Sequence, residues 1–129
     1  MSELPDGLRY TEEHEYVAAT DESGVYQVGI TDYAQGELGD VVYVELPAVG
    51  ESFERRATFG TIEAVKAVSD LYSPVAGEIV AVNESLGDDP SIVNSDPYGA
   101  GWMIRLRVSD VSEVDGLMDV AAYRALVGQ

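Results

Sequence analysis

The sequence contains no cysteine, and its 129 residues include a single lysine, Lys66. The absence of cysteine excludes disulfide bonds, thiolate metal sites and cysteine nucleophiles. No apolar run reaches the length of about 18 residues that a membrane span needs, so we expect no membrane partner. The first residues lack the basic and apolar regions of a signal peptide, so we expect a cytoplasmic protein.

Acidic residues far outnumber basic ones. The chain has 24 Asp and Glu against 7 Lys and Arg, which gives a net charge of −17 at pH 7. Nucleic-acid binding needs clustered Lys and Arg against the phosphates, so this composition argues against nucleic acid as a partner. The length is that of one domain of about 100–150 residues, and we expect residues 1–129 to form a single domain.

Short apolar runs predict a mainly β fold with short helices at both ends. Strands are expected over residues 25–30, 40–46, 78–83 and 102–108, where β-branched and aromatic residues recur. Thr11 begins a possible N-terminal helical turn, and residues 111–118 and 120–127 have helical spacing. The positions expected to be buried in the C-terminal helices are Leu117, Met118, Ala121, Leu126 and Val127.

Two segments of the chain resemble one another. Residues 39–50 and 77–87 both read glycine, acid, two β-branched residues, any residue and valine, followed by a loop that ends in glycine. Two copies are too few for a solenoid and favour a small barrel or sandwich of two related halves. The alternative is that this pattern is simply common where strands begin.

Lys66 lies near the midpoint between the two copies, between Val65 and Ala67. A primary amine can be acylated or can attack a carbonyl, which arginine cannot do. A link between two halves projects at one end, so the position favours an attachment point that another protein can reach. One lysine could also be an accident of composition. No second group accompanies it as a Schiff-base enzyme would require, and we expect no catalytic residues.

Several motifs carry a family resemblance. Residues 60–77 include Glu63-Ala-Val-Lys66-Ala and Ser73-Pro-Val-Ala-Gly77, and this stretch resembles the lipoyl-attachment segment of the glycine cleavage system H-protein family. The similarity extends from about Leu8 to Tyr123. The other matching stretches are His14-Glu-Tyr-Val17, residues 29–35, residues 38–47 and Asp96-Pro-Tyr-Gly-Ala-Gly-Trp-Met103.

The resemblance implies a fold and a cofactor. The fold would be a barrel-sandwich hybrid (lipoyl-domain-like) of two quasi-symmetric halves with short N-terminal and C-terminal helices. The attachment hairpin would span about residues 58–78, and the C-terminal helical segment about residues 110–127. Lys66 would carry lipoic acid in an amide bond, and the chain would be a monomeric carrier without catalytic activity.

The resemblance also implies partners. The carrier would take the aminomethyl group of glycine from glycine decarboxylase, a pyridoxal-phosphate enzyme, to the tetrahydrofolate-dependent aminomethyltransferase. Dihydrolipoyl dehydrogenase would reoxidise it, and a lipoylating enzyme would modify it. Glu15 and Asp70 would dock the aminomethyl ammonium group, while His14, the only histidine, is expected to be structural. Tyr16 and Ala64 depart from the family's usual tryptophan and serine.

Other interpretations stay open. A biotin carrier usually has methionines beside its lysine, and a 2-oxo acid dehydrogenase lipoyl domain usually has aspartate before it, whereas this chain has Val65. An H-like carrier used in lipoate relay and an unmodified binding module of the same fold both remain possible. The acidic stretch at residues 84–96 lacks the spacing of an EF-hand, so we expect a solvated loop and no metal site.

Scattered acids with almost no lysine predict adaptation to a high-salt cytoplasm. At about 1 M salt the Debye length falls to about 3 Å, which screens the self-repulsion of a chain with net charge −17. We therefore expect the melting temperature to rise between dilute buffer and molar KCl. Thermal melting followed by circular dichroism checks this, and an unchanged melting temperature would contradict salt adaptation.

Overall fold

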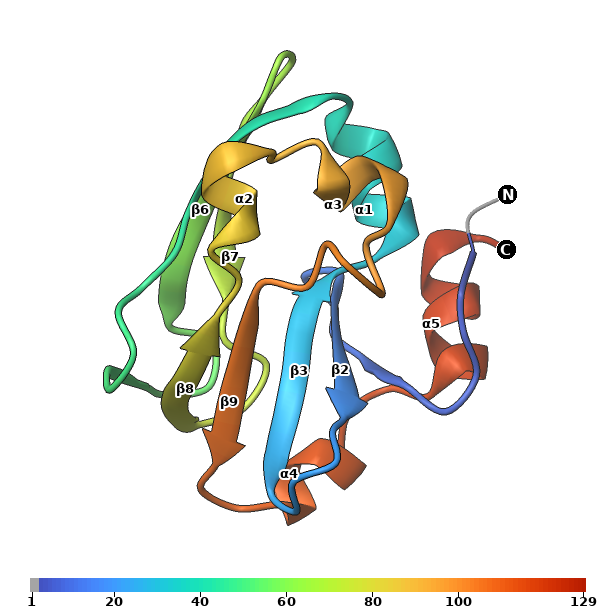
Figure 1. Ribbon diagram of the computed structural model, residues 1–129. Helices are drawn as coiled ribbons and strands as arrows, with labels where there is room; N and C mark the ends of the chain where they lie inside the picture. The colour runs from blue at the N-terminus through green and yellow to red at the C-terminus, as the bar shows by residue number, and fades with distance from the viewer. Residues whose placement is uncertain (1–2) are drawn as a thin grey trace.

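The computed structural model describes residues 3–129, which form two antiparallel β-sheets and short helices (Figure 1). The larger sheet has the strand order β1-β2-β3-β9-β8-β5, and the smaller has β4-β6-β7. The strands are β1 (Arg9–Tyr10), β2 (Glu15–Ala19), β3 (Val25–Ile30), β4 (Val41–Glu45), β5 (Ser52–Phe53), β6 (Thr58–Ala64), β7 (Val68–Tyr72), β8 (Gly77–Val82) and β9 (Ile104–Val108). The helices are α1 (Asp32–Leu38), α2 (Ser85–Asp88), α3 (Ile92–Ser95), α4 (Ser112–Asp115) and α5 (Val120–Val127).

The main core draws apolar side chains from both sheets. In β9, Ile104, Leu106 and Val108 are buried while the two intervening arginines are more exposed, because successive strand residues face opposite sides of a sheet. The smaller sheet contributes, among others, Val44, Phe59, Ile62 and Leu71 to the same core. Burial of these groups between two sheets is the main source of stability for a chain that has no cross-links.

The predicted strands agree with the structure to within two residues at each end. Strand β3 has the predicted bounds, and β4, β8 and β9 lie within the other three predicted ranges apart from one added residue at the start of β8. The two copies of the internal repeat supply β4 and β8, which belong to different sheets, as two related halves would require. The hairpin implied for residues 58–78 is the β6–β7 pair, whose second strand ends earlier, at Tyr72.

The expected short N-terminal helix does not form. Residues 12–14 make a turn, and His14 has φ of 71°, a left-handed conformation that cannot continue a right-handed helix. The Thr11 hydroxyl donates to the Glu15 carboxylate at 2.8 Å, which closes the turn just before β2. The first helix within residues 3–129 is α1, whose N-terminus is capped by the side chain of Thr31.

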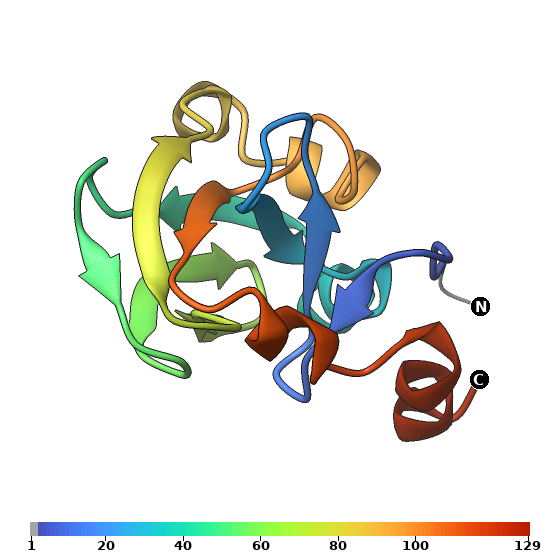
Figure 2. The same cartoon turned by 90° about the horizontal axis from the view of Figure 1, so that it is seen from below.

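Helix α5 has the predicted bounds but a different buried face. Tyr123 is fully buried, with Val120 and Val127 partly buried beside it, which is the i, i+3, i+7 stripe of a single helix face. The prediction that Ala121 and Leu126 are buried is wrong, because only this narrow stripe meets the rest of the fold. Figure 2 shows α5 at the edge of the molecule beside β1, where Tyr10 stacks on Tyr123 at 4.7 Å between ring centroids.

Helices α1, α2 and α3 gather at the same end of the molecule as the tip of the β6–β7 hairpin, which extends beyond them (Figure 1). At the opposite end, α4 lies beneath the large sheet. None of the helices within residues 3–129 has the length and apolar character needed to cross a membrane.

Candidate functional site

Lys66 occupies the tip of the β6–β7 hairpin. Glu63 pairs with Val68, and the Ala64 N–H donates to the Ala67 carbonyl at 2.7 Å, so the link between the strands is residues 65–67, with Lys66 at its centre. Val65 and Lys66 are both exposed, Val65 to 73 %. The amine therefore stands in solvent and not in the apolar pocket that typically activates a Schiff-base lysine.

The base of the tip is fixed by hydrogen bonds to the segment between α1 and β4. The Val65 N–H donates to the Asp40 carbonyl at 3.0 Å. That segment is held in turn by the side-chain amide of Asn94, which accepts from the Val41 N–H and donates to the Gly39 carbonyl, each at 2.9 Å. The partly buried side chain of Asn94 thus holds the backbone segment to which the hairpin tip is bonded.

Gly39 leaves room for the lysine side chain. It ends α1 with φ of 81°, a conformation that favours glycine. A Cβ atom built at Gly39 would lie 2.8 Å from Cε of Lys66, closer than two carbon atoms can approach. The aliphatic part of the Lys66 side chain therefore lies against the backbone of Gly39, where a larger residue would meet it.

A pocket of about 290 Å³ lies beside β7, between this strand, α1 and the start of β2. Its lining includes His14, Glu15, Tyr33, Leu38, Ile62 and Asp70. The structure therefore brings together Glu15 and Asp70, the two acids predicted for docking, although they are far apart in sequence. We call this cavity the β7 pocket.

Glu15 is an unusual carboxyl group because it is only 1 % exposed. It accepts hydrogen bonds from the Thr11 hydroxyl at 2.8 Å and from the Tyr72 N–H at 3.4 Å. Burial disfavours the carboxylate more than these two bonds favour it, and raises the pKa of Glu15 from 4.5 to about 8. Asp70, by contrast, is exposed on β7, where its backbone pairs with Thr61.

His14 has structural contacts, in agreement with its predicted role. Its Nδ1 atom lies 2.8 Å from the hydroxyl of Tyr123, and that hydroxyl lies 2.8 Å from the hydroxyl of Thr31. Burial lowers the pKa of His14 below 6.5, so the ring is neutral at pH 7. Helix α5 thereby holds the strained turn that precedes Glu15.

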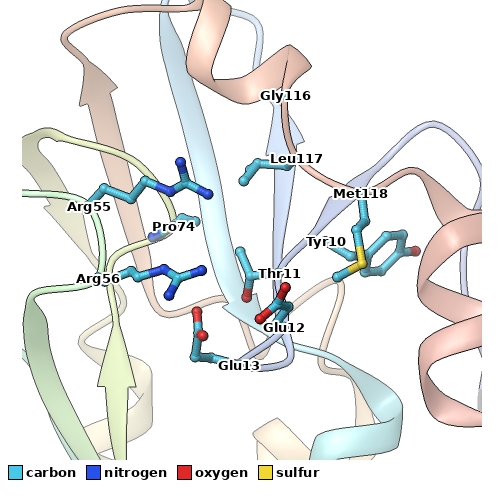
Figure 3. Close-up of a pocket in the computed structure, with 10 residues that line it drawn as sticks. All are labelled: Tyr10, Thr11, Glu12, Glu13, Arg55, Arg56, Pro74, Gly116, Leu117 and Met118. Carbon is cyan, nitrogen blue, oxygen red and sulfur yellow. The ribbon is translucent and has the colours of Figure 1, made fainter.

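A second hollow, of about 110 Å³, lies between the β5–β6 link and the N-terminal turn (Figure 3). Arg56 points toward Glu13 across the hollow, whereas Arg55 points toward Leu117. Arg56 is exposed and has φ of 71°, in the left-handed region that non-glycine residues rarely adopt. The lining has no histidine, cysteine or lysine, so the hollow lacks an activated nucleophile of the usual kinds.

The expectation of a solvated loop over residues 84–96 is wrong: the stretch forms α2 and α3 with turns around them, and Leu86 and Val93 are buried. Asn94 from this stretch is the residue that anchors Gly39 and Val41. Among residues 3–129 no group of three or more histidine and acidic side chains is arranged to hold a metal ion.

Sequence reasoning missed the supporting roles of Asn94 and Tyr123. Both side chains act on residues at least 53 positions away, so no local pattern reports their partners. A weak signal exists for Tyr123, since it is the aromatic residue on the apolar stripe of α5. Asn94 carries no comparable signal, because it lies in an acidic stretch without a regular apolar pattern.

Two packed β-sheets that present one exposed lysine at a hairpin tip define a lipoyl-domain-like barrel-sandwich hybrid. Comparison with solved structures agrees: a glycine cleavage system H protein from Mycobacterium marinum matches with a TM-score of 0.88 and 38 % identity, over 98 % of this chain and 100 % of the other.

Sequence comparisons identify the family. The profile described as Glycine cleavage H-protein matches residues 8–129. The glycine cleavage system H protein of Myxococcus xanthus is 55 % identical over 96 % of this chain and 95 % of its own length, and that of Bacteroides thetaiotaomicron is 51 % identical over 96 % and 97 %. The chain belongs to the glycine cleavage H-protein family.

The buried Glu15 predicts a pH dependence of stability. Between pH 4.5 and about 8 the folded chain holds a proton on Glu15 that the unfolded chain has released, so the free energy of unfolding falls as pH rises, by about 1.4 kcal/mol per pH unit from this group. Glu15→Gln removes this loss. We expect the variant to be more stable than the wild type at pH 9 and not at pH 4, as measured by urea denaturation.

Glu78 is an exposed glutamate on β8 and offers a matched control. Glu78→Gln makes the same chemical change at an exposed site, so it should not reproduce the gain in stability at pH 9 expected for Glu15→Gln. An equal stability of Glu15→Gln and wild type at all pH values would contradict the burial argument.

Proposed function

We propose that Lys66 carries lipoic acid in an amide bond and that the chain is the carrier subunit of the glycine cleavage system. One observation carries the proposal: the single primary amine of a lysine side chain stands exposed at the tip of the β6–β7 hairpin. Arginine cannot form this amide, and all six other basic residues are arginine. Gly39 leaves space for the lysine stem, and the β7 pocket offers a place for the group attached to it.

The lipoyl group supplies a disulfide that can be reduced and can carry an aminomethyl group. We infer that the chain presents it to glycine decarboxylase, to the tetrahydrofolate-dependent aminomethyltransferase and to dihydrolipoyl dehydrogenase, and receives it from a lipoylating enzyme. The fold contributes a tether: a reacting group fixed to Lys66 stays at high effective concentration and need not be captured again from solution. The chain itself then needs no catalytic residue.

The β7 pocket is proposed as the resting place of the aminomethyl ammonium group. Asp70 follows Lys66 by four residues along an extended strand, a distance of roughly 13 Å, which is of the order of an extended lipoyl-lysine side chain. Asp70 offers an exposed carboxylate at the entrance and Glu15 a buried one. A cation beside Glu15 favours its ionised form, so arrival of the ammonium group should be accompanied by release of a proton.

A cytoplasmic location and a monomeric state complete the proposal. They suit a small carrier that must visit several soluble enzymes in turn and keep its hairpin tip free.

Lys66→Arg keeps the positive charge and removes the primary amine, so it should abolish modification and glycine–bicarbonate exchange. Intact mass spectrometry should show one lipoyl adduct on the wild-type chain produced with a lipoylating enzyme, and none on the variant. Circular dichroism and thermal melting should be unchanged. A wild type without an adduct, or with biotin, would contradict the proposal, and loss of folding in the variant would instead indicate a structural lysine.

Asp70→Asn and Glu15→Gln should each shorten the lifetime of the aminomethyl group on the modified protein. Each variant loses a carboxylate that can bind the ammonium group, and a charge-assisted hydrogen bond of about 1.5–3 kcal/mol corresponds to an effect of roughly tenfold or more. Release of formaldehyde and ammonia from loaded protein measures the rate. Glu78→Gln serves as the control, and equal lifetimes in all three variants would contradict docking in the β7 pocket.

A further inference from the structure

Large apolar side chains are exposed around the hairpin tip. Of the seven exposed large hydrophobic residues within residues 3–129, four lie on β4 or at the tip of the β6–β7 hairpin. They are Val42, Tyr43, Val65 and Val68, with exposed fractions of 52 %, 49 %, 73 % and 67 %. We call these four residues the tip patch. Concentration of exposed apolar groups at one place on a very acidic chain is typical of an interaction site.

The strand register places part of the tip patch in one row. Glu63 of β6 pairs with Tyr43 of β4 on one side and with Val68 of β7 on the other. Directly paired residues of antiparallel strands project from the same face of a sheet, so Tyr43, Glu63 and Val68 lie side by side. A β-bulge between Val41 and Tyr43 leaves both Val42 and Tyr43 exposed, where regular alternation would have turned one of them inward.

Exposed carboxylates surround the tip patch. Besides Glu63 they are Asp40, Glu45 and Asp70, and the last two share the next row of the sheet through Thr61. The arginine pair of Figure 3 belongs to the link before β6, at the far end of the strand from Lys66. A complementary partner therefore presents an apolar centre with lysine or arginine around it.

We propose that the tip patch is the docking surface for the lipoylating enzyme, an acyl-transfer enzyme whose surface beside its active site is apolar and framed by basic residues. This inference rests on the proposed function. In that reaction Nζ of Lys66, after losing a proton to the enzyme, attacks the carbonyl of an activated lipoyl donor. The amide C–N bond forms, and the bond to the donor's phosphate or thiol leaving group breaks.

The geometry favours the lipoylating enzyme over the enzymes that act on the lipoyl group once it is attached to Lys66. Lipoylation requires Nζ itself to enter an active site, so the enzyme must cover the residues immediately around Lys66. The other enzymes act on the sulfur-containing ring at the far end of the lipoyl group, which the acyl chain separates from Nζ. They can therefore reach this ring without covering the hairpin tip. Val68 and Tyr43, which flank the hairpin, are then contacts of the attachment reaction.

The double variant Tyr43→Ser/Val68→Ser tests the inference, because both side chains are exposed and leave the core unchanged. With the full apo chain as substrate and a purified lipoylating enzyme, we expect KM to rise about tenfold or more, with little change in kcat. Val49→Ser and Val111→Ser remove side chains that are 59 % and 44 % exposed outside the tip patch, and should behave as wild type. Thermal melting confirms that each variant is folded.

A second measurement separates the possible occupants. The double variant is fully lipoylated with excess enzyme and assayed for glycine–bicarbonate exchange, where we expect the wild-type rate. Unchanged lipoylation kinetics in the double variant would overturn the inference. If glycine–bicarbonate exchange is slowed as well in that case, the tip patch is instead assigned to a glycine cleavage enzyme. A wild-type chain that accepts no lipoyl group would instead refute the proposed function itself.

Discussion

The pairing of β6 on both of its edges is the constraint on which the position of Lys66 depends. Strand β6 is the middle strand of the small sheet, between β4 and β7. Its last residues are held from both sides, since Val65 donates to Asp40 before β4 and Ala64 donates to Ala67 before β7. The backbone that carries the exposed lysine is therefore held in place by main-chain hydrogen bonds.

The same sheet connects the tip to the β7 pocket. Strand β7 runs from the tip toward Asp70, and the pocket continues to Glu15 at the start of β2 in the other sheet. Helix α5 contributes at a distance, because Tyr123 holds His14 in the turn that precedes Glu15. The C-terminal helix, which lies far from Lys66 in the sequence, thus helps to shape the cavity proposed to receive the aminomethyl group.

Sequence patterns predict those parts of this structure that depend on neighbours along the chain. Alternation identified β3 and β9, and the isolated lysine indicated an attachment point before any contact was known. The roles of Asn94 and Tyr123 could not be predicted this way, because each side chain acts on backbone or side chains brought near by the fold. The buried face of α5 was misplaced for the same reason, since only its neighbours decide which side of a short helix is covered.

An exposed apolar surface such as the tip patch favours self-association of the protein. The register of the small sheet explains how self-association through the tip patch is avoided. Long-range repulsion from a net charge of −17 fades as the salt concentration rises, so it protects the tip patch only in dilute solution. Glu63, however, lies between Tyr43 and Val68 in the same row. Two copies that meet through this face must bury like charges against each other, whereas a partner with a basic residue opposite Glu63 avoids that cost. The carboxylate therefore selects among partners at contact distance, where salt screens least.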